Sequence, residues 1–252
     1  MAGAVRTERN RNIVTIILDN PAKRNSLDLP LLDGLQKAAG EIAADTSVMA
    51  VMLRGGDDKA FCAGADFDAF TQSSAIEQGV AAMEKAITKA TDALARLEVP
   101  IVAAIRGACF GGGVQLALAA DIRIASADSR FGIPAARIGI AYPLQAIAQV
   151  VALSGAGHAA QIFLTAEPFD AAAALQRQLI DEVVGIDAFE SRIRAVTETI
   201  AACPRPALTA YKGMIRKLAF DRDIAAAALL HAELMDSKCY VSRLEEIAQK
   251  RK

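Results

Sequence analysis

The stretch that decides the interpretation of this sequence is Arg106-Gly-Ala-Cys-Phe-Gly-Gly-Gly-Val-Gln-Leu-Ala117. An apolar run, Ile101-Val-Ala-Ala-Ile105, precedes it, and its last residues open a short apolar segment, Val114 to Ala120. This order is typical of a buried strand, a glycine turn and a helix. Glycines directly before a helix leave backbone N–H groups free at the positive end of the helix dipole, and they let an oxygen atom approach closely. The turn is therefore a candidate binding site for a substrate oxygen.

A second junction of small residues lies earlier in the chain. Ala60-Phe-Cys-Ala-Gly-Ala-Asp66 follows the apolar run Val48 to Leu53, and it is too rich in small residues to predict a regular element. If the two junctions face each other, one N–H group from each could hold an oxyanion. That arrangement suits an acyl group that becomes an enolate or a tetrahedral adduct, and one such donor lowers the barrier by roughly 3 to 4 kcal/mol.

The triple glycine Gly111 to Gly113 has other interpretations. It does not match a phosphate-binding loop of the GxxxxGK[ST] type, because no Lys-Ser/Thr pair follows it, and a dinucleotide GxGxxG motif is also absent. A tight packing turn without a function stays open on these residues alone.

The remaining pattern predicts an α/β fold. Apolar, strand-like runs alternate with helical stretches in the first half, and strands separated by helices are typical of an α/β chain. The pattern is helical from Gly155 onward, and Pro204-Arg-Pro206 interrupts it before two final helices. We expect strands at 13–18, 48–53, 101–105 and 121–125, and helices from about 28, at 76–97, 114–120, 207–220 and 224–249.

Composition excludes several classes of function. The 252 residues hold 28 Lys and Arg against 29 Asp and Glu, so bulk attraction to nucleic acid or to an anionic membrane is not expected. Although 53% of the residues are hydrophobic, no run approaches the roughly 18 apolar residues that a membrane span needs. The four cysteines form no CxxC pair and the two histidines no HExxH motif, which argues against a metal site. With no signal peptide in Met1 to Asn12, we expect a cytoplasmic protein with packed, reduced thiols.

Several motifs in register give a more specific identification. The sequence resembles the crotonase (enoyl-CoA hydratase/isomerase) superfamily from about Asn12 to Lys252. The motifs that carry the resemblance are Pro21-Ala-Lys-Arg-Asn-Ser-Leu-Asp28, Ala60 to Asp66, Arg106 to Ala117, Asp121-Ile-Arg-Ile-Ala125 and Phe131-Gly-Ile-Pro134.

The resemblance implies a fold and an assembly. Residues 1–203 would form a spiral of ββα turns that binds acyl-CoA, and residues 204–252 would form a helical oligomerisation region. The protein would be a homotrimer or a dimer of trimers. Its substrate would be an acyl-CoA thioester, so coenzyme A would be part of the substrate and no separate cofactor is expected.

The resemblance also implies site residues. The thioester carbonyl would lie between the backbone N–H groups of Ala65 and Gly112. Ala63 and the stretch Ala65-Asp66-Phe67-Asp68 would line the acyl-CoA site. Lys23 and Arg24 match a loop near the CoA nucleotide, where cations suit phosphates. Lys250 matches a basic position that reaches the CoA of a neighbouring subunit, although Ile247 stands where an aromatic residue is usual.

The sequence departs from the hydratases of this family at both catalytic glutamates. The first position is Gln115 and the second is Ala135, and neither side chain can accept a proton as a general base. Each lost acid–base group typically costs 10²–10⁴-fold in rate, so efficient hydration of enoyl-CoA is not expected. Simple isomerases of the family generally keep a carboxylate at the second position, which weakens that alternative too.

Tyr142 is the first candidate to replace these groups. Ile138-Gly-Ile-Ala-Tyr-Pro143 resembles a segment of the decarboxylase branch that places a tyrosine in the pocket, where a phenol could protonate a carbanion. That branch carries a histidine where Ala65 stands here, so the match is partial. Arg137 is a second candidate, because it could pair with an acyl carboxylate.

Three functions therefore remain open. The first is an enzyme that stabilises a thioester enolate and carries out an isomerisation, decarboxylation or related lyase step. The second is a non-catalytic acyl-CoA-binding protein. The third is a weak hydratase that positions water through Gln115. We also expect Phe67, Phe70, Met83, Phe110 and Leu144 as candidates for an apolar acyl pocket.

Overall fold

Two β-sheets and the helices around them form the body of the protein. The structure, a computed structural model, describes residues 2–57, 59–66, 76–221, 223–235 and 237. The larger sheet has six strands in the order β1-β2-β3-β5-β7-β10. These strands are β1 (Ala4–Asn10), β2 (Ile13–Asp19), β3 (Ala50–Gly55), β5 (Ile101–Ile105), β7 (Ile122–Ser126) and β10 (Glu182–Val184). All neighbouring pairs are parallel except β1 and β2.

The smaller sheet runs beside the larger one and gives the fold its spiral character. It has the order β4-β6-β8-β9. Its strands are β4 (Ala60–Cys62), β6 (Ala108–Phe110), β8 (Arg130–Gly132) and β9 (Phe169–Asp170). In chain order β3 leads to β4, β5 to β6 and β7 to β8, so each turn adds one strand to each sheet before a helix follows. The expected ββα spiral is confirmed.

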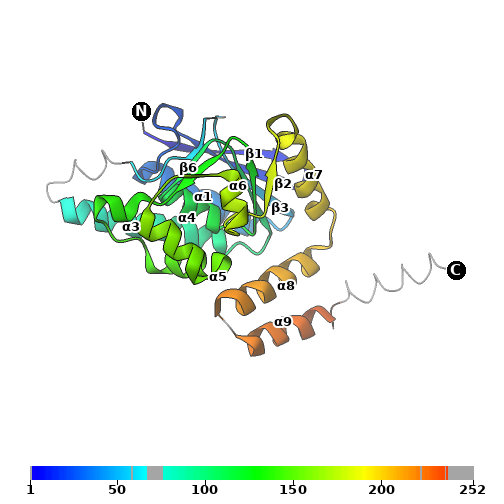
Figure 1. Cartoon of the computed structure of the whole chain (residues 1–252). Helices are drawn as coiled ribbons and strands as arrows, with labels where there is room; N and C mark the ends of the chain where they lie inside the picture. The colour runs from blue at the N-terminus through cyan, green and yellow to red at the C-terminus, as the bar shows by residue number, and fades with distance from the viewer. Residues whose placement is uncertain (1, 58, 67–75, 222, 236, 238–252) are drawn as a thin grey trace.

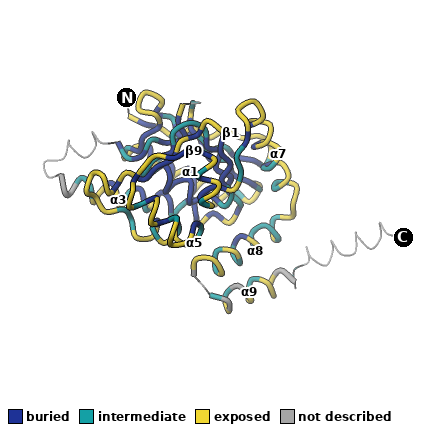
Figure 2. The backbone as a smooth tube through the Cα atoms, viewed as in Figure 1, coloured by how far each residue is buried: buried dark blue, intermediate teal, exposed yellow. Residues whose placement is uncertain are grey.

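Helices cover both faces of the larger sheet (Figure 1). Successive side chains of a strand point to opposite faces of the sheet, and both faces are covered here. This explains why β5 is apolar throughout. Ile101, Ala103 and Ile105 face the main core, whereas Val102 and Ala104 pack in a second cluster with residues of α7. The helices are α1 (Leu29–Ala44), α3 (Ile76–Ala95), α4 (Gly112–Leu118), α5 (Leu144–Ala160), α6 (Ala171–Gln176) and α7 (Phe189–Ala201). The buried backbone lies between these layers (Figure 2).

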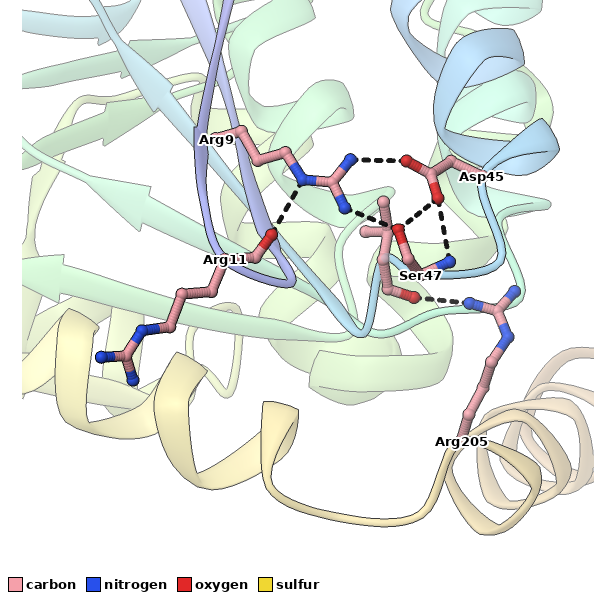
Figure 3. A network of polar contacts seen from close by, with 6 residues as sticks. Arg9, Arg11, Asp45, Ser47 and Arg205 are labelled. Carbon is pink, nitrogen blue, oxygen red and sulfur yellow. Dashed lines mark hydrogen bonds and ion pairs between the residues drawn. The ribbon is translucent and has the colours of Figure 1, made fainter.

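The last two helices, α8 (Arg205–Arg216) and α9 (Ile224–Met235), lie beside this body (Figure 1). Lys212 joins α8 to the larger sheet, because its Nζ lies 2.8 Å from Oδ2 of Asp121 and donates to the Val99 carbonyl at 2.9 Å. Burial lowers the pKa of Lys212, against the attraction of the Asp121 carboxylate. The guanidinium of Arg205 donates to a backbone carbonyl near the start of β3 (Figure 3).

One helical stretch, Leu144–Thr165, is long and apolar enough to cross a membrane by length and composition alone. From the sequence, no stretch long and apolar enough for a membrane span was expected. Length and composition are a weak indication of a span, and here Gly155, with φ 73°, interrupts the helical backbone. Ala146 and Val150 of the same stretch are buried, at 1% and 0% exposure.

The long buried strands lie close to the expected positions, and other elements do not. The prediction of no regular element at Ala60–Asp66 is wrong for β4, and the helical pattern expected after Gly155 omits β9 and β10. The hairpin strand β1 was not expected either. Its sequence, Ala4–Asn10, carries three charged side chains and is mostly exposed, so it shows no apolar period.

Candidate active site

The loop after β4 is held by the loop between β2 and α1. The Leu27 N–H donates to the Gly64 carbonyl at 2.8 Å, and the Asp66 N–H donates to the Leu27 carbonyl at 2.8 Å. Asn25 is fully buried, and its Nδ2 donates to the Ala60 carbonyl at 2.8 Å. Its backbone has φ 56°, a conformation that asparagine tolerates better than most residues. These contacts fix Ala65 from both sides.

The glycine turn before α4 packs directly against this loop. A methyl group on Gly113 would overlap the Cys62 carbonyl oxygen, so only glycine fits there. A methyl group on Gly112 would lie 2.8 Å from Cδ1 of Leu27 and 3.6 Å from the backbone nitrogen of Ala65. The two junctions of small residues, far apart in the sequence, therefore meet in the structure.

Two backbone amides at this meeting point have no partner among the loop hydrogen bonds of the described residues. The Gly111 N–H donates to the Gly132 carbonyl at 2.9 Å, and the Gly111 carbonyl accepts from the Gln115 N–H at 3.2 Å. The N–H groups of Ala65 and Gly112 take part in none of these bonds. Unpaired N–H groups at a helix start are the usual donors for an anionic oxygen.

A cavity of about 170 Å³ opens at these amides. Ala63, Ala65, Gly112, Gln115 and Tyr142, all predicted from the sequence, line it together. The other lining residues are mostly apolar: Gly64, Val80, Met83, Glu84, Ile87, Phe110, Gly111, Ile133, Pro134, Ala135, Ile138, Ile140, Ala141 and Pro143.

Tyr142 lines the cavity, but its hydroxyl is already bonded. It donates to the Gly111 carbonyl at 2.9 Å, and its ring lies 5.5 Å from that of Phe163. Burial raises the pKa of Tyr142, so the phenol stays protonated. In this arrangement the hydroxyl supports the glycine turn.

The two positions of the family glutamates provide no acid or base. The side chain of Gln115 is 5% exposed, lines the cavity and makes no hydrogen bond within the described residues. Ala135 lines the same cavity. Burial raises the pKa of the nearby Cys62 thiol to about 12, which makes it a poor nucleophile. The described ranges hold no group of three His, Cys, Asp or Glu side chains placed for a metal ion.

The predicted charged residues lie outside the cavity lining. Nζ of Lys23 lies 2.7 Å from Oδ2 of Asp66, and this ion pair joins the two loops. Arg24 has φ 52°, and its carbonyl accepts from the Ala63 N–H at 3.0 Å. Arg137 is exposed.

The pocket predictions have mixed outcomes. Met83 and Phe110 line the cavity, whereas Leu144 is 81% exposed and does not. Phe67, Asp68, Phe70, Ile247 and Lys250 lie outside the described residues.

One face of α3 lines the cavity, and only Met83 of that face was predicted from the sequence. Val80, Met83, Glu84 and Ile87 share that face, because residues three and four apart are neighbours on a helix, and all of them line the cavity. The spacing is visible in the sequence, but nothing in it shows that this face meets the glycine turn.

Comparison with known proteins identifies the family. The sequence profile described as enoyl-CoA hydratase/isomerase matches residues 8–245. The short-chain-enoyl-CoA hydratase of Clostridium acetobutylicum is 33% identical over 180 residues, or 70% of this chain and 67% of that protein. The peroxisomal Delta(3,5)-Delta(2,4)-dienoyl-CoA isomerase of Arabidopsis thaliana is 27% identical over 226 residues, or 84% of this chain and 80% of that protein. A crystal structure of an enoyl-CoA hydratase/carnithine racemase from Magnetospirillum magneticum matches with a TM-score of 0.92 and 31% identity, covering 99% of this chain and 94% of that one. The chain belongs to the enoyl-CoA hydratase/isomerase family of the crotonase superfamily.

Proposed function

We propose that this protein is an acyl-CoA enzyme that stabilises a thioester enolate with the backbone N–H groups of Ala65 and Gly112. The observation that carries the proposal is the contact between their loops, where a methyl group on Gly112 would lie 3.6 Å from the Ala65 nitrogen. Both residues line one cavity. Two fixed donors at one oxygen stabilise the charge that develops there without reorganisation during the reaction.

The cavity favours a short acyl group. Its volume is about 170 Å³, and a protein cavity of about 150 Å³ lined by apolar residues holds benzene. An acyl chain of comparable size, such as a butyryl or crotonyl group, matches this space. Lys23 and Arg24 lie on the loop between β2 and α1, which is hydrogen-bonded to the loop of Ala65. We propose that they contact the phosphates of coenzyme A.

An isomerase-type or decarboxylase-type reaction is favoured over hydration. Hydration needs one group to activate water and one to handle the carbon-bound proton, and Gln115 and Ala135 supply neither. The hydrogen bond from Tyr142 to Gly111 argues that this phenol supports the turn rather than protonating the substrate. The lack of an acid–base group at Gln115 and Ala135 also favours a second candidate function, a protein that binds acyl-CoA without turning it over.

The proposed assembly is a homotrimer or a dimer of trimers formed through residues 204–252. Large apolar side chains on α8 and α9 are exposed in the single chain, with Tyr211 at 58%, Ile215 at 61% and Leu229 at 67%. Burial of such side chains against a second copy would remove them from water. We also propose a cytoplasmic location.

A pair of variants at Gly112 tests the main proposal. Gly112→Pro removes the N–H group and adds a Cβ atom next to Leu27. Gly112→Ala adds the Cβ atom but keeps the N–H group. We expect Gly112→Pro to lose about 10²–10³-fold in turnover of short acyl-CoA substrates relative to Gly112→Ala. Equal turnover in the two variants would contradict the role of this amide.

Calorimetry and product screening separate the remaining candidates. Tight binding of butyryl-CoA or crotonyl-CoA, with no product from a broad panel of thioesters, would favour the non-catalytic protein. Hydration of crotonyl-CoA that is lost in Gln115→Ala would instead support a weak hydratase.

A further inference from the structure

One carboxylate on α3 belongs to the lining of the cavity. Glu84 is the single acidic side chain among the described residues that line the cavity. It lies on the face of α3 that also carries Val80, Met83 and Ile87, and Met83 and Ile87 are only 2% and 7% exposed. Glu84 itself is exposed, so it stands at the edge of this apolar face and keeps contact with water.

The face of α3 that carries Glu84 packs against the glycine turn through Ile87. Cδ1 of Ile87 lies 3.5 Å from the point where a methyl group on Gly112 would be. Glu84 is three residues earlier on the same face, about 4.5 Å along the helix axis. Glu84, Ala65 and Gly112 line the same cavity, so an acyl group whose carbonyl oxygen is held by the two amides shares that cavity with the Glu84 side chain.

The carboxylate of Glu84 is also free to act. The described residues give it no hydrogen bond and no ion pair, and it is an exposed residue of the cavity lining. The other polar side chains of the lining, Gln115 and Tyr142, are an amide and a bonded phenol. Neither competes with Glu84 for a proton.

We infer that Glu84 is the general base and general acid of the acyl site, an inference that rests on the proposed function. Its carboxylate takes a proton from the carbon next to the thioester carbonyl, and the electrons of that C–H bond form the enolate. The protonated Glu84 then returns the proton to the same carbon, or to carbon 4 of a 3-enoyl thioester, which yields the 2-enoyl isomer. The step needs no water and no other reactant, so one carboxylate suffices for isomerisation but not for hydration.

Hydrogen exchange tests the inference without knowledge of the natural substrate. The full-length protein is incubated in D₂O with butyryl-CoA, and deuterium at the carbon next to the carbonyl is followed by mass spectrometry. Isomerisation of 3-butenoyl-CoA to crotonyl-CoA is measured in parallel. We expect Glu84→Gln to lower both rates by about 10²–10⁴-fold, with unchanged calorimetric affinity for butyryl-CoA. Glu84→Asp should keep an intermediate rate.

The control is Glu41→Gln, which removes an exposed carboxylate of α1 outside the cavity lining and should leave both rates unchanged. Parent-like rates in Glu84→Gln, together with lost rates in Gly112→Pro, would overturn the role of Glu84 and keep the proposed function. Parent-like rates in both variants would overturn both. A parent protein that binds butyryl-CoA but catalyses neither reaction would also overturn the role of Glu84.

Discussion

At the scale of single residues, one peptide group links Tyr142 to the proposed chemistry. The carbonyl of Gly111, which accepts from the Tyr142 hydroxyl at 2.9 Å, belongs to the same peptide group as the Gly112 N–H. Because a trans peptide group is planar, holding its oxygen fixes the direction of its N–H on the opposite side. Tyr142 is thus placed to orient Gly112 rather than to touch the substrate.

Tyr142→Phe removes this hydrogen bond and leaves the ring in place. We expect kcat for 3-butenoyl-CoA isomerisation to fall about tenfold, equivalent to about 1.4 kcal/mol in the barrier, with KM nearly unchanged. The unfolding free energy should fall by only about 1 kcal/mol. Steady-state kinetics and urea denaturation check both values, and Tyr211→Phe, at an exposed position, is the control. A loss of stability with unchanged kcat would show a purely structural bond.

The sequence allowed the prediction of the backbone donors but not of the carboxylate. The two junctions of small residues indicated backbone donors, and the resemblance to the crotonase superfamily assigned them to Ala65 and Gly112. Glu84 looks like one of many charged residues on an amphipathic helix. Only the packing of Ile87 against the glycine turn reveals which face of α3 meets the cavity.

At the scale of elements, a polar network secures the turn after α1. Asp45 accepts hydrogen bonds from Ser47 and pairs with Arg9 of β1, as Figure 3 shows. The Ser47 hydroxyl, followed by the Arg9 guanidinium, lowers the pKa of Asp45 from 3.8 to about 2. A carboxyl whose pKa is lower in the folded state stabilises the fold above its unfolded pKa, and this contribution is lost as the pH falls through the folded value.

Asp45→Asn should therefore destabilise the protein most above pH 3.8 and progressively less as the pH falls toward about 2. Urea denaturation of the parent and the variant across this range measures the difference. Ser47→Ala, which removes the largest cause of the lowered pKa, should reduce the same pH dependence. A difference between parent and Asp45→Asn that does not vary with pH would contradict the assignment.

Element prediction succeeded where burial imposes a continuous apolar run. β5 is buried on both faces, and its bounds, Ile101–Ile105, match the expected strand. Strands of two or three residues such as β9 and β10 are too short to show any period, and their pairing partners are distant in the sequence. Such strands form because tertiary contacts override the local pattern.

At the scale of the whole molecule, α8 and α9 stand beside the spiral with apolar side chains exposed. The order of motifs allowed the spiral to be predicted, but the contacts of α8 with the body depend on a buried Lys212–Asp121 pair that no local pattern indicates. The division at residue 203 stays a prediction.

Ile215→Glu should convert the expected trimer or hexamer to smaller species, because a charge would be buried in the contact. Light scattering after size-exclusion chromatography measures the mass. Ile186→Glu, on a 47% exposed residue of the body, is the matched control. A parent protein that elutes as a monomer would contradict the expected assembly.

The loop contact at Ala65 and Gly112 has a consequence for how this family diversifies. Every residue except proline carries a backbone N–H group, so changes of side chain cannot remove the two donors while the loops stay packed. Carboxylates, in contrast, can disappear from one wall and arise on another through single substitutions. A lineage can thereby acquire a new reaction while its oxygen-binding scaffold is inherited unchanged.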